Sequence, residues 1–107
     1  MTVWTKLKEE LDRAGRAAQV AIDEGKLRLE LMRTRQLADK AAQAIGYAVY
    51  RAKLEGQEVD NDTYSRLSAS LGAHEAEIAR QEAELKRLRD ARQAPAADPP
   101  SDPPPAQ

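Results

Sequence analysis

No proline occurs in the first 94 residues, whereas all six prolines of the 107-residue chain fall between Pro95 and Pro105. Proline breaks helices, so its absence leaves the first 94 residues free to form long ones. These residues are also rich in Ala, Leu, Glu, Lys, Arg and Gln, which have the highest helix propensities. We therefore predict an all-α chain.

The composition changes at the end of the chain. The segment 94–107 combines proline with Ala, Asp and Ser and has no large aliphatic or aromatic side chain to bury, which is typical of a disordered tail. Pro100 and Pro103 have the P-x-x-P spacing of ligands for proline-recognition domains. The nearby charges are acidic rather than basic, which favours a plain disordered tail over a docking motif.

One segment interrupts the proline-free stretch and predicts a turn between two helices at 56–62. Gly56 follows Arg51 and Lys53, and cations of this kind suit the C-terminus of a helix. The residues after Gly56 include four candidate N-caps for the next helix, namely Asp60, Asn61, Asp62 and Thr63.

Both helices flanking this turn carry an apolar seam whose members are spaced alternately by three and four residues, as in a coiled coil. The C-terminal helix has Tyr64, Leu67, Leu71, His74, Ile78, Gln81, Leu85 and Leu88, and the preceding helix has Leu27, Leu31, Thr34, Ala38, Ala41, Ile45, Ala48 and Ala52. Folding at the turn brings Ala52 near Tyr64, Ile45 near Leu71, Ala38 near Ile78 and Leu31 near Leu85 and Leu88. Large residues then meet mostly small ones, which predicts an antiparallel, coiled-coil-like helical hairpin over residues 26–93.

Residues 1–25 predict a further amphipathic helix. Gly25 could end this helix and let it fold back along the hairpin, or the helix could run on through Gly25 into the first hairpin arm. The phase favours continuity, because apolar residues on both sides of Gly25 then share one stripe, about 180° from the seam. We call this stripe the apolar face and define it by Trp4, Leu7, Leu11, Ile22, Leu29, Met32, Tyr47, Tyr50 and Leu54.

A lone hairpin would leave the apolar face exposed, and a two-helix hairpin of this size has a thin core. We therefore predict a homo-oligomer, with a dimer favoured, and a non-enzymatic scaffold or adaptor function that includes protein partners. The alternative is a peripheral membrane protein that uses residues 2–22 as an amphipathic anchor, with Trp4 at the interface. The polar side of that segment is not enriched in Lys and Arg, so only modest affinity for a membrane surface is expected.

The formal net charge of −1 conceals a separation of charges along the hairpin. Its open end collects basic residues that we call the basic end, namely Lys26, Arg28, Arg33, Arg35, Lys86, Arg87, Arg89 and Arg92. This end could contact a polyanion, a lipid surface or an acidic neighbour, or its charges could be solvated and paired with Glu30, Glu82, Glu84 and Asp90. The second interpretation is favoured, and nucleic-acid binding is not expected at a pI of about 5.9.

The side-chain inventory argues against catalysis. The chain has no cysteine and one histidine, His74, which excludes thiolate zinc sites, a cysteine nucleophile and multi-histidine metal sites within one chain. None of the common nucleotide-binding, hydrolase or metalloprotease motifs occurs. We expect no enzyme activity, cofactor or metal. The absence of a long apolar run and of a secretory signal predicts a cytoplasmic protein.

The sequence also contains two runs, GKLRLEL from Gly25 and AIGYAVYRAKLEG from Ala44, followed by a turn and a helix rich in Glu, Ala and Leu. This arrangement resembles the helical stem of small uncharacterised bacterial proteins in which the stem precedes a zinc ribbon. The resemblance covers residues 1–92 and implies a helical bacterial protein. No C-x-x-C motif follows the stem here, and a proline-rich segment stands in the place of the ribbon, so no zinc function is implied.

Overall fold

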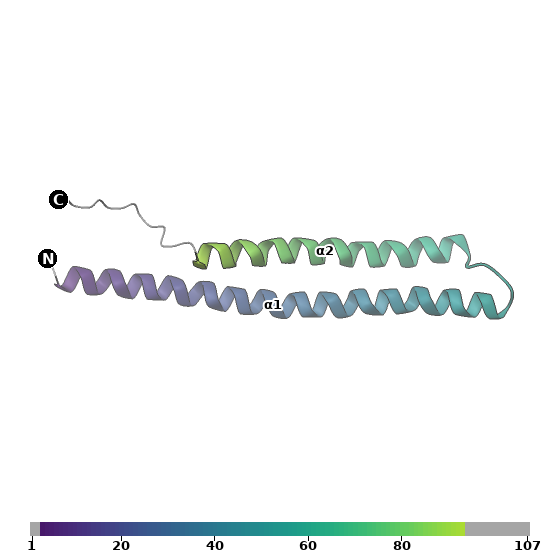
Figure 1. The fold of residues 1–107 in the computed structure, drawn as a ribbon, viewed down its shortest axis with the longest axis horizontal. Coiled ribbons are helices and arrows are strands. Elements are labelled where there is room, and N and C mark those ends of the chain that lie inside the picture. The colour runs from purple at the N-terminus through teal and green to yellow at the C-terminus, as the bar shows by residue number, and fades with distance from the viewer. Residues whose placement is uncertain (1–2, 94–107) are drawn as a thin grey trace.

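The chain forms a hairpin of two antiparallel helices (Figure 1). The computed structural model describes residues 3–93. Helix α1 spans Val3–Leu54 and helix α2 spans Asn61–Gln93. The particle is a rod with dimensions of 81 × 26 × 17 Å. The predicted all-α hairpin is confirmed, whereas the predicted disordered tail at 94–107 lies outside the described residues.

Helix α1 runs through Gly25 without a break. Of the two alternatives left by the sequence, the structure therefore has the continuous helix and not the fold-back. Each glycine inside a helix costs about 1 kcal/mol relative to alanine. Gly25 interrupts neither the hydrogen-bonded backbone nor the seam, because the spacing of seam positions continues from Glu24 through Leu31 to Ala52.

The turn uses a glycine-terminated helix end followed by an aspartate cap. Gly56 adopts a left-handed φ of 70°. Its N–H donates to the carbonyl oxygen of Lys53 at 3.0 Å, and the N–H of Gln57 donates to that of Ala52 at 2.8 Å, which is the Schellman pattern. These bonds satisfy carbonyls that the end of α1 would otherwise leave unpaired.

Asp60 is the residue that caps α2, among the four candidates in the sequence. Its Oδ2 accepts from the backbone N–H of Thr63 at 3.0 Å and from the Thr63 hydroxyl at 2.9 Å. These two hydrogen bonds hold the pKa of the Asp60 carboxyl below its usual value, and the bond from the Thr63 backbone has the larger effect. The cap therefore stabilises the fold above the unfolded-state pKa and weakens as the pH falls through the folded-state pKa.

The core is a narrow seam between the helices. Leu31, Thr34 and Ala38 of α1 are buried together with Gln81 and Leu85 of α2. The other seam positions are half-buried on both helices, namely Leu27, Ala41, Ile45, Ala48 and Ala52 on α1 and Leu67, Leu71, His74, Ile78 and Leu88 on α2. A seam of this width leaves most of each helix surface in contact with solvent.

One predicted seam residue is more exposed than the others. Tyr64 is 51% exposed, so it lies at the edge of the seam. Val59 and Thr63 are half-buried in this part of the chain, and the Thr63 hydroxyl is bonded to Asp60. Residue 64 lies in the first turn of α2. There the Asp60 cap, in addition to the heptad spacing, determines where the side chains lie.

We predict that Gly56→Ala lowers the free energy of unfolding by about 1 kcal/mol, because alanine is strained at a positive φ. Gly72→Ala is the matched control. Gly72 lies inside α2 with open space around the position of an added Cβ, so its substitution should raise the free energy of unfolding by up to about 1 kcal/mol. Urea denaturation at equal protein concentration measures both. Equal effects of the two substitutions would contradict this account of the turn.

Candidate functional site

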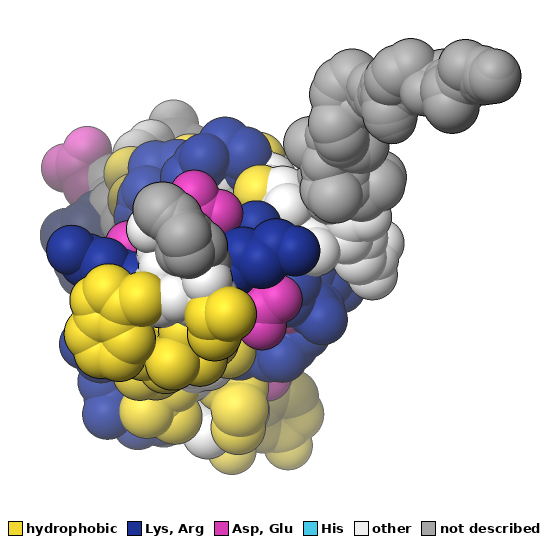
Figure 2. Space-filling model, turned by 90° about the vertical axis from the view of Figure 1, so that its left-hand side faces the viewer, with side chains coloured by type: hydrophobic (Ala, Val, Ile, Leu, Met, Phe, Trp, Pro, Cys, Tyr) yellow, Lys and Arg dark blue, Asp and Glu magenta, His cyan; other side chains and the backbone are white. Residues whose placement is uncertain are grey.

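The apolar face of α1 is the most prominent exposed surface of the molecule. All nine of its residues are exposed, from 49% at Leu7 and Leu29 to 74% at Trp4. Viewed from the N-terminal end of the rod, hydrophobic side chains gather on the lower side, which is the side of α1 turned away from α2 (Figure 2). The structure thus places all nine residues on a surface that α2 does not cover.

Helix α1 extends well beyond the end of α2 (Figure 1). The cross-helix ion pair nearest to this extension joins Glu24 to Arg92. We call residues 3–22 the overhang. Every residue from 3 to 19 is exposed, which corresponds to about 25 Å of single helix at 1.5 Å per residue. Isolated helices of about this length are only marginally stable in water, so the overhang lacks the packing that stabilises the rest of α1.

The apolar side of the overhang points away from the line of α2. At 100° per residue, Leu7, Leu11 and Ile22 lie on the opposite side of α1 from Leu31 and the other seam residues. The overhang positions in phase with the seam carry Glu9, Arg13 and Arg16, and then the half-buried Val20 near the end of α2. A partner that covers the apolar side must therefore lie behind α1 and not in line with α2.

The apolar face is divided by a polar stretch. Gln36, Lys40 and Gln43 occupy its middle and are exposed. Beyond them lies the tyrosine patch, which consists of Tyr47, Tyr50 and Leu54 and is also exposed. The guanidinium carbon of Arg51 lies 5.5 Å from the centre of the Tyr47 ring, within the range of a cation–π contact. A shallow depression of about 420 Å³ is lined by Gln43, Gly46, Tyr47 and Tyr50.

Most members of the basic end form ion pairs with acidic partners within the hairpin. Three of its eight members, Lys26, Arg33 and Arg89, form no ion pair within the part of the chain that the structure describes. A hydrogen bond from Arg87 holds the pKa of Glu84 below its usual value and raises the pKa of Arg87. Five of the eight members form ion pairs: Arg28 and Arg92 with Glu24, Arg35 with Glu82, Lys86 with Asp90, and Arg87 with Glu84.

Glu24 is a buried carboxylate that the sequence analysis missed. Its side chain is 4% exposed and lies 2.8 Å from Arg28 Nη2 and 3.0 Å from Arg92 Nε. The two guanidinium groups are about half exposed, so the carboxylate is the desolvated member of this cluster. The signal was its spacing, because Glu24 lies three residues before Leu27 and so extends the seam by one position.

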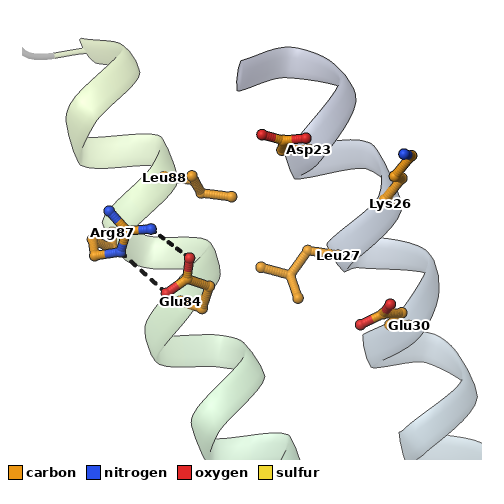
Figure 3. Close-up of a pocket in the computed structure, with 7 residues that line it drawn as sticks. All are labelled: Asp23, Lys26, Leu27, Glu30, Glu84, Arg87 and Leu88. Atoms are coloured by element: carbon orange, nitrogen blue, oxygen red, sulfur yellow. Dashed lines mark hydrogen bonds and ion pairs between the residues drawn. The ribbon is translucent and has the colours of Figure 1, made fainter. Parts of the chain in front are cut away.

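Two open grooves flank the seam near the open end. One, of about 280 Å³, is lined by Asp23, Lys26, Leu27, Glu30, Glu84, Arg87 and Leu88 (Figure 3). There Leu27 and Leu88 point toward each other across the gap between the helices, and Arg87 is bonded to Glu84 of its own helix (Figure 3). The other groove, of about 440 Å³, has Met32, Leu31 and Leu85 among its lining residues. No Ser, Thr, Cys or His side chain is among the residues that line either groove.

Three further features bear on ligands and membranes. Among residues 3–93, no group of three or more His, Asp or Glu side chains is arranged to hold a metal ion. His74 is half-buried in the seam. Neither α1 nor α2 combines the length and apolar character needed to cross a membrane.

Comparison of the chain with protein-family models, curated proteins and solved structures gave no match.

We predict that Glu24→Gln lowers the free energy of unfolding by about 1–2 kcal/mol, because it removes the charge that both arginines contact. The effect should be smaller than for a fully buried pair, since the guanidinium groups keep part of their hydration. Amide hydrogen exchange should also speed up in the last turn of α2. The control is Glu75→Gln, which makes the same substitution at an exposed position of α2. Equal free energies of unfolding for the two variants would contradict this interpretation of Glu24.

Proposed function

We propose that the chain is a non-enzymatic scaffold protein that self-associates through the apolar face of α1 and presents the hairpin to protein partners. The observation that carries this proposal is the apolar face itself, with Trp4 at 74% exposure and eight further large side chains in one line. Exposed apolar patches rimmed by charge are typical of protein–protein interfaces. Tryptophan and tyrosine are also the residues most often found at energetic hot spots of such interfaces.

The weakness of the intramolecular core supports the same proposal. Only Leu31, Ala38 and Leu85 are buried apolar residues in the described part of the chain, so a lone hairpin gains little from the hydrophobic effect. Covering the apolar face with a second copy would bury several large side chains, each contributing about 1.5–3 kcal/mol when fully buried. Small helical domains commonly rely on association of this kind.

The basic end is not used in this proposal. Because most of its charges already have acidic partners, it offers a weak field to a polyanion. Nucleic-acid binding therefore remains outside the proposed function. The cytoplasmic location and bacterial origin stay predictions from the sequence.

We predict that the double substitution Trp4→Ala, Leu11→Ala converts the protein from an oligomer into a monomer at tens of micromolar, measured by analytical ultracentrifugation. Neither residue contacts α2, so the hairpin itself should stay folded. Leu37→Ala is the matched control, because Leu37 is 49% exposed like Leu7 but lies about 100° away from the middle of the apolar face. A monomeric wild type, or a double variant with unchanged mass, would refute self-association through this face.

A second function is favoured by one specific observation. Trp4 is highly exposed at the end of an amphipathic overhang, as in helices that lie in the membrane interface. The polar side of the overhang mixes basic and acidic residues, such as Lys8 and Arg13 with Glu9 and Asp12, so anionic lipid would attract it only weakly.

Co-sedimentation with anionic vesicles separates the two functions. The scaffold proposal predicts that the protein stays in the supernatant at physiological ionic strength, where surface charges are strongly screened. Binding that is lost in Trp4→Ala but kept in Leu37→Ala would instead support the membrane-anchor function.

A further inference from the structure

We infer that two copies of the chain associate through their overhangs, which lie antiparallel along their apolar sides, so that the two hairpins extend in opposite directions. This inference rests on the proposed self-association and adds the partner segment and its orientation. The partner segment is residues 3–22 of a second copy. The tyrosine patch stays outside the paired region.

The position of the overhang selects where the partner lies. Every residue from 3 to 19 is exposed, whereas α1 beyond Glu24 is packed against α2. The overhang is therefore the part of α1 that gains most from a second helix. Its apolar side faces away from the line of α2, so a partner helix can lie there without meeting α2 of the same copy.

The order of large and small residues selects the antiparallel direction. Along its apolar side the overhang has Trp4, Leu7 and Leu11 first and then Ala14 and Ala18. An antiparallel pair places Leu7 opposite Ala18 and Leu11 opposite Ala14, with Trp4 at the ends beside Ile22. Each layer then combines a large residue with a smaller one, which lets two helices keep a constant separation of about 8–10 Å.

A parallel pair has no such match. It would place Trp4 opposite Trp4, Leu7 opposite Leu7 and Ala18 opposite Ala18. The helices would be held apart at one end and leave space between alanines at the other, which forfeits packing contacts.

The flanking charges are compatible with the antiparallel register. Lys8 lies beside Gly15 of the second copy, and Glu10 lies beside Ala17. Like charges are therefore not opposed along either edge of the paired segment. The small size of Gly15 and Ala17 also lets the longer side chains pass toward solvent.

A full-length pairing of two α1 helices is disfavoured by the polar stretch of the apolar face. An antiparallel pair that overlaps from Trp4 to Leu54 would place Ala18 opposite Lys40 and Ile22 opposite Gln36. Both polar side chains are exposed in the structure and would lose hydration without gaining a charged or hydrogen-bonding partner on the facing row. Pairing of the overhangs alone leaves them in water.

The antiparallel overhang pair also fits sterically. In this register, Glu24 of one copy lies just beyond Val3 of the other, so each hairpin body begins where the partner helix ends. The two α2 helices are then separated by the length of the paired overhangs.

Thiol cross-linking tests the orientation, because the chain has no cysteine of its own. Leu7→Cys and Ala18→Cys are made as separate full-length variants, and one is isotopically labelled. The variants are mixed and oxidised, and the disulfide-linked peptides are identified by mass. The antiparallel pair predicts mixed disulfides between positions 7 and 18, in several-fold excess over disulfides between identical positions. Identical positions would be displaced by about 16 Å along the axis, beyond the reach of a disulfide.

The other outcomes each decide one point. Disulfides only between identical positions would indicate a parallel pair and overturn the inference. A mixed disulfide between Leu11→Cys and Tyr47→Cys, with none between positions 7 and 18, would indicate full-length pairing and also overturn it. Dimers by ultracentrifugation with no cross-link at any of these positions would overturn the orientation while self-association stands. A monomer under all conditions would refute the proposed function as well.

A second pair of variants keeps the test valid if Leu7→Cys weakens association. Lys8→Cys and Gly15→Cys retain every apolar side chain of the overhang. Joined by a short bismaleimide, these positions should link in the mixed sample and far less in either variant alone. Leu37→Cys, which lies off the apolar face, measures the background of random collisions.

Discussion

Two helices that pack side by side bury only one stripe of each, and this limit shapes the whole molecule. The seam from Glu24 to Ala52 of α1 takes up the residues that face α2, yet only six residues in the described part of the chain are buried. Every other apolar residue of α1 must lie on the surface or meet another molecule. Because α1 has 52 residues and α2 has 33, the limit is most severe in the overhang, where every residue from 3 to 19 is exposed.

The register of the hairpin determines which part of α1 packs against α2. The buried apolar residues of the seam are Leu31, Ala38 and Leu85. Across the seam, Arg35 of α1 forms an ion pair with Glu82 of α2 at 2.7 Å. Glu24 closes the paired region with Arg92. The buried carboxylate and its two arginines thus lie close to the boundary between the part of α1 that packs against α2 and the exposed residues 3–19.

Much of this architecture follows from the sequence, for identifiable reasons. The all-α class, the hairpin and the approximate turn follow from proline-free composition, heptad spacing and Gly56. Tyr64 is more exposed than its seam position predicts, because spacing alone does not describe the first turn of a capped helix. Glu24 was missed because a charged residue at a seam position counts as polar surface until its arginine partners are seen in space. Helix phase predicted which face of α1 is exposed, but phase cannot name the molecule that covers it. The structure adds the end of α2 at Gln93, beyond which residues 3–19 of α1 are exposed among the residues that it describes.

Small-angle X-ray scattering with mass determination tests the central claim that overhangs pair antiparallel. Two 52-residue helices that share about 20 residues form a particle about 125 Å long at 1.5 Å per residue, compared with 81 Å for one hairpin. We predict the mass of two copies and a maximum dimension close to the longer value. A two-copy particle only about 80 Å long, or the mass of a single copy, would contradict the claim.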